Sequence, residues 1–371
     1  MGMKVVERRG PKNKRSPKRR ERKHSFGSVL FTLLAAVAGC GLLLSYLALF
    51  FNPTQHPVPM FFGLYYIPIL LLNLLLLLIA LFRHPRTLLI PVIALLPTLL
   101  LADRFVKFGR EEQQLEGSHI KVLSYNLGRY DAGGKRVTAT ESVSGIKRYL
   151  AEQNADVVCL QEFAVKDTNT LSVYLPDYPY RARHLFKGDR YFGNLTLSKY
   201  PIRQVSSLTF PDSRNLSLVT DIEVDGRTVR VYNCHLESYS LSFTSLIKRI
   251  FHKESFTDEV VQVHERVHEA TRRRSAQVDA LLQREAESPY PNLVCGDFND
   301  TPVSYTYHRL TKTKKDSFVE AGKGFSGTYS VLWPMLRINY ILLPQEYTAD
   351  RHQTDRIPWS DHYPVTTYIY F

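Results

Sequence analysis

Three apolar runs dominate the first hundred residues of the chain. Residues 27–51 and 60–82 contain no charged side chain, and residues 88–102 form a shorter apolar run that two prolines interrupt. About 20 apolar residues are enough for an α-helix to cross the hydrocarbon core of a bilayer. We therefore expect a transmembrane region over residues 25–102, with these three runs as its spans.

From residue 119 onward, short apolar runs alternate with segments of helical spacing. The runs that suit strands are 120–127, 156–162, 216–224, 227–237, 292–298, 338–343 and 365–371, and helical spacing marks 141–155 and 258–287. Asp225-Gly226, between two of the runs, is a strong hairpin signal. Hairpins mixed with strand–helix–strand units predict a mixed α/β domain rather than a purely parallel sheet.

The positive charge of the chain is concentrated at its N terminus. Residues 1–24 carry eleven Lys and Arg against two Glu, a net charge of +9 out of a formal total of +13. Residues 25–118 add +1, which leaves +3 for residues 119–371. The basic pI therefore belongs mostly to the tail, and the charge gives little support to a nucleic-acid-binding domain. Residues 103–118 are polar and are expected to form a linker.

The distribution of basic residues predicts the membrane orientation. The basic tail favours a cytoplasmic N terminus, the loop 52–59 lacks Lys and Arg, and Arg83 and Arg86 follow the second run. Three spans would place the domain outside the cytoplasm, tethered as part of an integral membrane protein. Three basic residues after the third run oppose this orientation: Arg104, Lys107 and Arg110. If the third run only enters the membrane, the domain is cytoplasmic.

The four cysteines form neither a disulfide framework nor a metal pattern. Cys40 lies in the first apolar run, and Cys159, Cys234 and Cys295 lie singly in separate strand-like runs. Such scattered cysteines are typical of small core residues.

Polar side chains recur at the ends of the predicted strands. They are Asn126, Glu162, His235, Asp297, Asn299, Asp361 and His362. Each residue alone has a simpler explanation, such as a turn, a helix start or a hydrogen-bonded core position. Asp297 and Asn299 in particular belong to the turn-forming sequence Gly-Asp-x-Asn. Their recurrence at strand after strand favours one common site, because rigid strands present side chains for chemistry.

The residue types in this set suit hydrolysis of a phosphate ester. Asn, Glu and Asp offer hard oxygen ligands for Mg²⁺ or Mn²⁺, and the sequence has no Cys/His cluster at zinc spacing. Two histidines near carboxylates or amides suit a general base and a general acid. A hard metal with such histidines would support attack of water on phosphorus.

Seven short motifs in order resemble the endonuclease/exonuclease/phosphatase superfamily, which has the DNase I-like fold. They are SYNLG, LQE, LSKYPI, NCHLE, GDFND, RINYILL and SDHYPV, spread over residues 119–371. The resemblance is to a membrane-anchored member of bacterial type. It implies a four-layer α/β sandwich, two packed mixed sheets flanked by helices, that cleaves phosphoesters with Mg²⁺ or Mn²⁺.

The resemblance also implies roles for individual residues. Asn126, Glu162 and Asp361 correspond to metal-site residues, with Glu162 the direct ligand. His235 corresponds to a histidine beside the leaving or bridging oxygen, and His362 to the general base. Asp297 and Asn299 correspond to the pair that positions water and phosphate. Asn339 stands where the family usually has an aspartate that orients the base histidine, and GNLTLSKYPI keeps only part of its motif.

These features predict a membrane-anchored, metal-dependent phosphoesterase. Its partners would be the lipid bilayer and a phosphoester substrate, such as a lipid head group, a nucleotide, a sugar phosphate or a nucleic acid, and no obligate protein partner is evident. The first alternative is a nuclease for DNA or RNA, which the near-neutral domain disfavours. The second is a catalytically weakened binding module at the membrane, for which Asn339 is the only support.

Two further segments have helical spacing. Residues 241–251 predict an amphipathic helix packed on the domain, with contact to membrane or lipid as the alternative. The three arginines within residues 271–277 predict a solvated helix face, from which one arginine could reach a phosphate.

Overall fold

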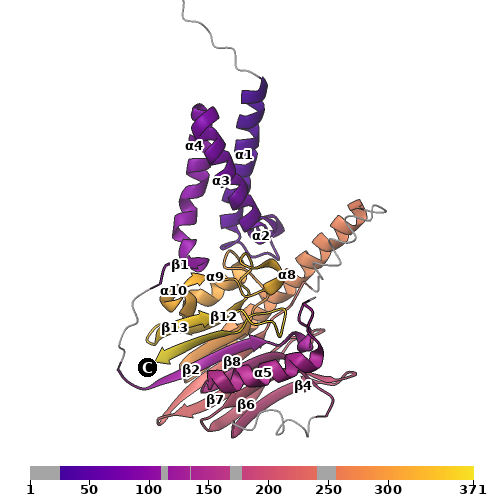
Figure 1. Cartoon of the computed structure of the whole chain (residues 1–371), viewed down its shortest axis with the longest axis vertical. Coiled ribbons are helices and arrows are strands. Elements are labelled where there is room, and N and C mark those ends of the chain that lie inside the picture. The colour runs from indigo at the N-terminus through magenta and orange to yellow at the C-terminus, as the bar shows by residue number, and fades with distance from the viewer. Residues whose placement is uncertain (1–25, 110–115, 134, 168–177, 240–255) are drawn as a thin grey trace, which may run out of the picture.

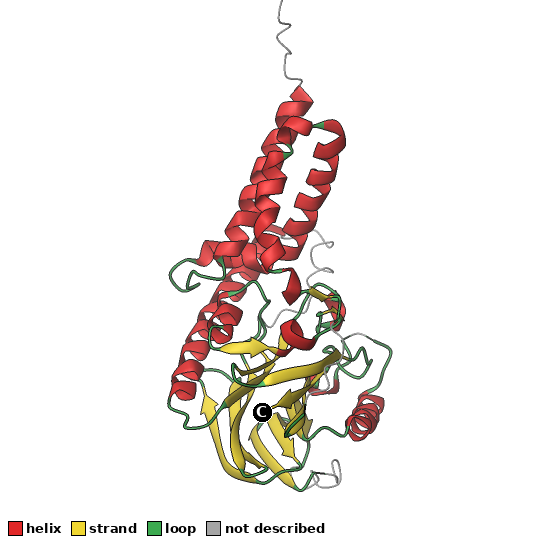
Figure 2. Cartoon of the chain, turned by 90° about the vertical axis from the view of Figure 1, so that its left-hand side faces the viewer, coloured by secondary structure: helices red, strands yellow, loops and turns green. Residues whose placement is uncertain are grey.

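A computed structural model describes residues 26–109, 116–133, 135–167, 178–239 and 256–371. Within these residues, a bundle of apolar helices extends from one end of two stacked β-sheets (Figure 2). The predicted tail 1–24 and the predicted amphipathic helix 241–251 lie outside the described residues.

The helical bundle makes three passes. The first two are α1 (Phe26–Leu47) and α3 (Tyr66–Arg83), joined through α2 (Pro57–Leu64), and the third comprises η1 (Pro85–Thr87), α4 (Leu89–Leu95) and η2 (Leu96–Leu100). Among the described residues, α1 and α3 are long and apolar enough to cross a membrane, a test that a signal sequence also meets. The third pass is a shorter apolar helix, and it tightens to a 3₁₀ helix at Leu96, where Pro97 lacks the N–H that an α-helix would use.

Polar side chains link the three passes inside the bundle. The amide of Asn73 in α3 donates to the carbonyl oxygen of Ala38 in α1 at 2.9 Å. The hydroxyl of Tyr46 donates to the carbonyl oxygen of Ala94 in α4 at 2.9 Å. Hydrogen bonds between helices are a main source of association for apolar helices, so the third pass packs as an integral part of the bundle.

Two six-stranded mixed sheets form the domain, and each contains one parallel pair. The first sheet has the order β13 (Thr348–Thr354), β14 (Val365–Tyr370), β2 (His119–Asn126), β3 (Val157–Val165), β5 (Tyr191–Ser198), β4 (Tyr180–Phe186). The second has the order β10 (Lys314–Asp316), β12 (Asn339–Pro344), β9 (Asn292–Asp297), β8 (Arg227–His235), β7 (Leu216–Val224), β6 (Ile202–Thr209).

Three apolar clusters define four layers. One cluster lies between the sheets and includes Val122 and Cys159 of the first sheet with Val231 and Cys295 of the second. A second cluster packs α5 (Ala139–Gln153) on the outer face of the first sheet. The third packs α8 (Phe256–Ala286) and α9 (Tyr305–Thr311) on the other outer face. The predicted four-layer α/β sandwich is therefore confirmed (Figure 1).

Two local expectations were wrong. Part of the predicted linker 103–118 is built into the domain, because β1 (Val106–Lys107) pairs with β11 (Gly324–Phe325). The arginines of residues 271–277 do not form one solvated face: Arg272 is exposed, but Arg274 is fully buried and pairs with Asp300 at 3.1 Å. Because successive residues of a helix point in different directions, the neighbouring arginines of α8 lie on different faces and differ in burial.

Candidate active site

The polar residues meet where three strands, β2, β8 and β9, end beside the middle of β3. In the first sheet, Asn126 at the end of β2 lies beside Gln161 of the parallel strand β3. In the second, His235 at the end of β8 lies beside Asp297 at the end of the parallel strand β9. The side-chain nitrogen of Asn126 donates to Asp297 Oδ2 at 2.8 Å, so a buried hydrogen bond joins the two sheets at this edge.

Glu162 enters the site through a bulge. The sequence suggested a strand that ends at this residue, but β3 continues to Val165, and its pairing with β5 shifts register between Leu160 and Phe163. Glu162 has φ +48°, which is uncommon for a residue with a side chain. A bulge re-aims a side chain. Here Glu162 Oε1 lies 3.3 Å from the Asn126 amide nitrogen and 3.6 Å from His235 Nε2.

Gly296 allows β9 to lie close to β8. Its φ is +135°, and a Cβ at this position would lie 1.9 Å from the carbonyl oxygen of Cys234. Only glycine fits such an approach. The glycine therefore keeps His235 and Asp297 side by side at the strand ends.

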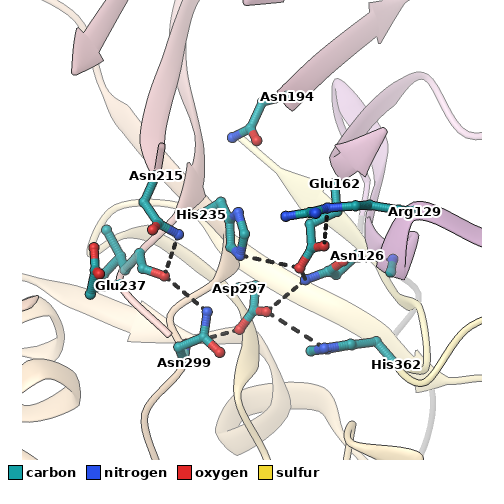
Figure 3. Close-up of polar contacts among 12 residues, drawn as sticks. Asn126, Arg129, Glu162, Asn194, Asn215, His235, Glu237, Asp297, Asn299 and His362 are labelled. Atoms are coloured by element: carbon teal, nitrogen blue, oxygen red, sulfur yellow. Dashed lines mark hydrogen bonds and ion pairs between the residues drawn. The ribbon is translucent and has the colours of Figure 1, made fainter. Parts of the chain in front are cut away.

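Asp297 and Asn299 have a turn role as well as a place in the site. Asp297 Oδ1 accepts the backbone N–H of Asn299 at 2.9 Å, as the turn explanation requires. Asn299 also has φ +51°, and its amide donates to the carbonyl oxygen of Leu236 at 2.9 Å. Asp297 Oδ2 points into the cluster, 3.7 Å from His362 Nε2 (Figure 3).

His362 is buried and held from two sides. Its Nδ1 donates to Asn339 Oδ1 at 2.9 Å, and the ring of Tyr329 lies across it at 5.3 Å between centroids. This bond leaves Nε2 directed toward Asp297 and toward Asp361 Oδ1 at 3.9 Å. The Asn339 side-chain nitrogen is buried and has no hydrogen-bond partner in the described part of the chain.

Burial and neighbouring charges shift the pKa values of two carboxyl groups in the site in opposite directions. Burial acts to raise the pKa of Glu162, but His235, His362 and Arg129 outweigh it and hold that pKa below the ordinary value. Burial raises the pKa of Asp361, and the neighbouring Glu162 and Asp297 raise it further against the effect of His362. The neighbouring carboxylates thus make ionisation of Asp361 harder, as like charges held close together do.

Three site residues had little signal in the sequence. Arg129 lies in the loop after β2, and its Nε is 3.2 Å from Glu162 Oε2, with the guanidinium 4.5 Å from the ring centre of Phe192. The amide of Asn215 donates to the same Leu236 carbonyl that Asn299 contacts. Asn194 is buried beside the site and donates to the carbonyl oxygen of Asn233 (Figure 3). Its only signal was the partly kept GNLTLSKYPI motif.

The donor set suits a hard divalent cation held by few protein groups. Among the described residues, no three His, Cys, Asp or Glu side chains converge on one point as a closed metal site. Mg²⁺ does not need such a cage, since one or two carboxylates with water and phosphate oxygens suffice. The carboxylates of Glu162 and Asp297 near Asp361 fit a cation there. Asn126 differs from expectation, because its oxygen accepts the Gly128 N–H at 2.9 Å and its nitrogen faces the carboxylates.

The sandwich with this strand-end cluster defines a DNase I-like α/β protein. The chain belongs to the Endonuclease/Exonuclease/phosphatase family, whose sequence profile matches residues 123–362. A second profile, described as a domain of unknown function, matches residues 28–105. No curated protein sequence matches the chain.

Solved structures share the fold at low sequence identity. An endonuclease/exonuclease/phosphatase from Beutenbergia cavernae is 15% identical with a TM-score of 0.53, over 68% of this chain and 72% of that one. A protein of the same description from Bacteroides vulgatus is 16% identical with a TM-score of 0.51, over 68% and 98%. D. rerio TDP2, complexed with a single-strand DNA product, is 18% identical with a TM-score of 0.50, over 68% and 100%.

Proposed function

We propose that this chain is a membrane-anchored hydrolase that cleaves phosphate esters by attack of water, with Mg²⁺ or Mn²⁺ as cofactor. The observation that carries the proposal is the convergence of Glu162, Asp297 and His362 from both sheets on one edge of the sandwich. Membership of the family supports an activity of the phosphoesterase or nuclease class in general.

His362 is the proposed general base. Asn339 fixes its Nδ1–H, so the lone pair of Nε2 faces the interior of the site. Nε2 would take a proton from the attacking water, and Asp297, 3.7 Å away, would stabilise the imidazolium that forms. Burial of this group excludes competing water and strengthens these interactions.

His235 and Asn299 are placed for the other half of the reaction. His235 Nε2 lies 3.6 Å from Glu162 Oε1, and His235 would give a proton to the leaving oxygen. Asn299 is held by the Leu236 carbonyl at the rim and would position the phosphoryl group. When bound through Glu162 and Asp361, Mg²⁺ or Mn²⁺ would offset charge on the phosphoryl oxygens.

A nuclease is the second candidate. The solved D. rerio TDP2 structure holds a single-strand DNA product, which makes single-stranded DNA the first nucleic acid to test. The net charge of +3 over residues 119–371 counts against tight binding to duplex DNA.

The test is turnover by the full chain in detergent with Mg²⁺, with Mn²⁺ and with EDTA. The substrates are phospholipids, nucleotides, sugar phosphates, single-stranded DNA and RNA. We expect metal-dependent hydrolysis of at least one class. Hydrolysis of nucleic acid that falls steeply with salt would favour the nuclease. Metal binding without turnover of any substrate would favour the binding module and contradict the proposal.

A further inference from the structure

The segment from Ala102 to Lys107 connects the helical bundle to the domain and contacts both. We call residues 102–107 the exit segment, because they follow the third apolar pass. The ring of Phe105 stacks on Tyr66 of α3 at 5.4 Å, so one side of the exit segment packs in the bundle. Val106 and Lys107 pair as β1 with β11 of the domain, and Figure 1 shows β1 at the junction beside α10.

The side chain of Arg104 holds the loop that follows Asp297 and Asn299. Its Nη1 donates to the carbonyl oxygen of Pro302 at 2.9 Å, and the guanidinium lies 5.0 Å from the ring centre of Tyr307. The next residue, Val303, is buried in the apolar cluster of the bundle. A Cβ on Gly63 of α2 would lie 2.7 Å from the Val303 carbonyl oxygen, so this loop is in direct backbone contact with the bundle.

The backbone of the same residue holds the loop that surrounds His362. The carbonyl oxygen of Arg104 accepts Ser326 Oγ at 3.0 Å and Arg337 Nη1 at 3.2 Å, and the Ser326 N–H donates to the Phe105 carbonyl at 2.9 Å. Ser326 and Arg337 bracket the segment that contains Tyr329, the residue packed on the His362 ring. Arg337 also precedes Asn339, the hydrogen-bond acceptor of His362, by two residues.

These anchors are buried rather than incidental surface contacts. Arg337 is 1% exposed and pairs with Asp316, which also accepts the Tyr307 hydroxyl at 2.7 Å. Ser326 is 2% exposed. Hydrogen bonds to charged groups in a buried setting are costly to remove, so the contacts hold both loops firmly. The positive charge of Arg104, which opposed the predicted orientation, thus has a local structural use.

We propose that Arg104 is a positioning residue that clamps the Asn299–Val303 loop and the Ser326–Ile338 loop in their catalytic arrangement. The inference rests on the proposed function. It makes the exit segment part of the scaffold of the site instead of a passive tether. A small displacement of positioned groups can cost about 100-fold in rate, so loosening the clamp should act mainly on the chemical step.

The test compares three variants of the full chain in detergent. Arg104→Ala removes the bond to Pro302 and the contact with Tyr307, and Arg104→Lys retains a cation and a donor. Arg86→Ala is the matched control, because Arg86 is exposed in η1 at the start of the same pass. We expect Arg104→Ala to lower kcat by about 10- to 100-fold with KM changed less than about threefold. Arg104→Lys should recover part of the loss, and Arg86→Ala should match the wild type.

Hydrogen–deuterium exchange provides a readout that needs no turnover. In Arg104→Ala, backbone amides of residues 299–303 should exchange faster than in the wild type, while those of residues 326–338, which the carbonyl of residue 104 still holds, and those of β2 and β3 should not. Ser326→Ala removes the hydroxyl bond to the carbonyl of Arg104 and tests the second loop, with faster exchange expected in residues 326–338 whether or not Arg104→Ala folds. Wild-type exchange and kcat within twofold in the alanine variants would overturn the clamp. If the wild type turns over no substrate, the proposed function fails, while faster exchange in these loops would still support the clamp.

Discussion

Asn339 is the residue at which this chain departs most clearly from its family's usual pattern. Its oxygen accepts from His362 Nδ1 at 2.9 Å, so the amide does the orienting work expected of an aspartate. Its buried nitrogen has no partner among the described residues, which is a cost of burying the amide here. An amide, however, brings no negative charge to the imidazolium that forms when His362 takes a proton.

We predict that Asn339→Asp raises turnover by roughly tenfold, because a charge-assisted hydrogen bond is about twice as strong as a neutral one. The carboxylate favours the protonated imidazole, so the acidic limb of the pH–rate profile should move to higher pH. The measurement is kcat/KM between pH 5 and 9. Asn339→Ala, which removes the acceptor, should be slower than the wild type. Superimposable profiles for the aspartate variant and the wild type would contradict the prediction.

At the residue scale, the sequence indicated the site residues that lie at strand ends. Asp297 and His235 could be found because a buried strand precedes each of them. Arg129 could not, because it reaches Glu162 from a loop in which Arg129 and Tyr130 both have positive φ. No periodic pattern marks such a conformation.

At the scale of elements, edge strands and interruptions were the hardest features to predict. The edge strand β6 has an exposed face and lacks the apolar run that marked the central strands. The bulge at Glu162 depends on pairing with β5, which periodicity does not record. Central strands such as β9 were predictable because both of their faces are buried.

The packing of α10 (Ser317–Ala321) against β13 gives the domain an acid-sensitive contact. His352 of β13 is buried, with its Nδ1 2.8 Å from Ser317 Oγ. Burial lowers the pKa of His352 to about 3, with Arg337 lowering it further and Asp316 opposing. Since the folded-state pKa lies below the ordinary value of 6.5, the unfolded chain takes up the proton first as the pH falls. The contribution of His352 to the free energy of unfolding is therefore fully present above pH 6.5 and is lost as the pH falls from there to about 3.

We predict that His352→Gln lessens this loss, because glutamine can still bond Ser317 but does not titrate. The measurement is the thermal midpoint of the full chain between pH 7.5 and 4. The curve of the variant should be flatter than that of the wild type. His119→Gln, at an exposed histidine, is the control and should follow the wild type. Parallel curves for His352→Gln and the wild type would show that His352 does not govern the acid limb.

At the scale of the whole molecule, the bundle and the sandwich are joined by contacts that the sequence did not predict. The bonds from Arg104 to Pro302, Ser326 and Arg337 connect residues about 200 positions apart. The pattern of apolar and polar residues within a short stretch of sequence cannot reveal such pairs. The apolar runs and the four-layer sandwich were predictable because each depends on local periodicity or on motif order.

The three passes also bear on orientation. Figure 1 shows the start of α1 and the turn between α3 and α4 at the end of the bundle remote from the sheets. We predict that all three passes cross the membrane. With the basic N terminus in the cytoplasm, three crossings place the domain outside the cytoplasm. A reporter that functions only outside the cytoplasm should be active when fused after Phe371. Activity of a cytoplasm-only reporter at the same position would contradict this topology.

The central claim is that the strand-end cluster hydrolyses a phosphate ester, and the most direct measurement is kcat for Glu162→Gln and His362→Ala on the best wild-type substrate. We expect each variant to lose at least about 100-fold, because general acid–base catalysis and charge stabilisation each contribute factors of roughly 10²–10⁴. Circular dichroism should show that both variants are folded, although His362→Ala should lower the thermal midpoint, because it removes a buried ring and leaves the Asn339 oxygen without its donor. Folded variants that retain near-normal metal-dependent turnover would contradict the account.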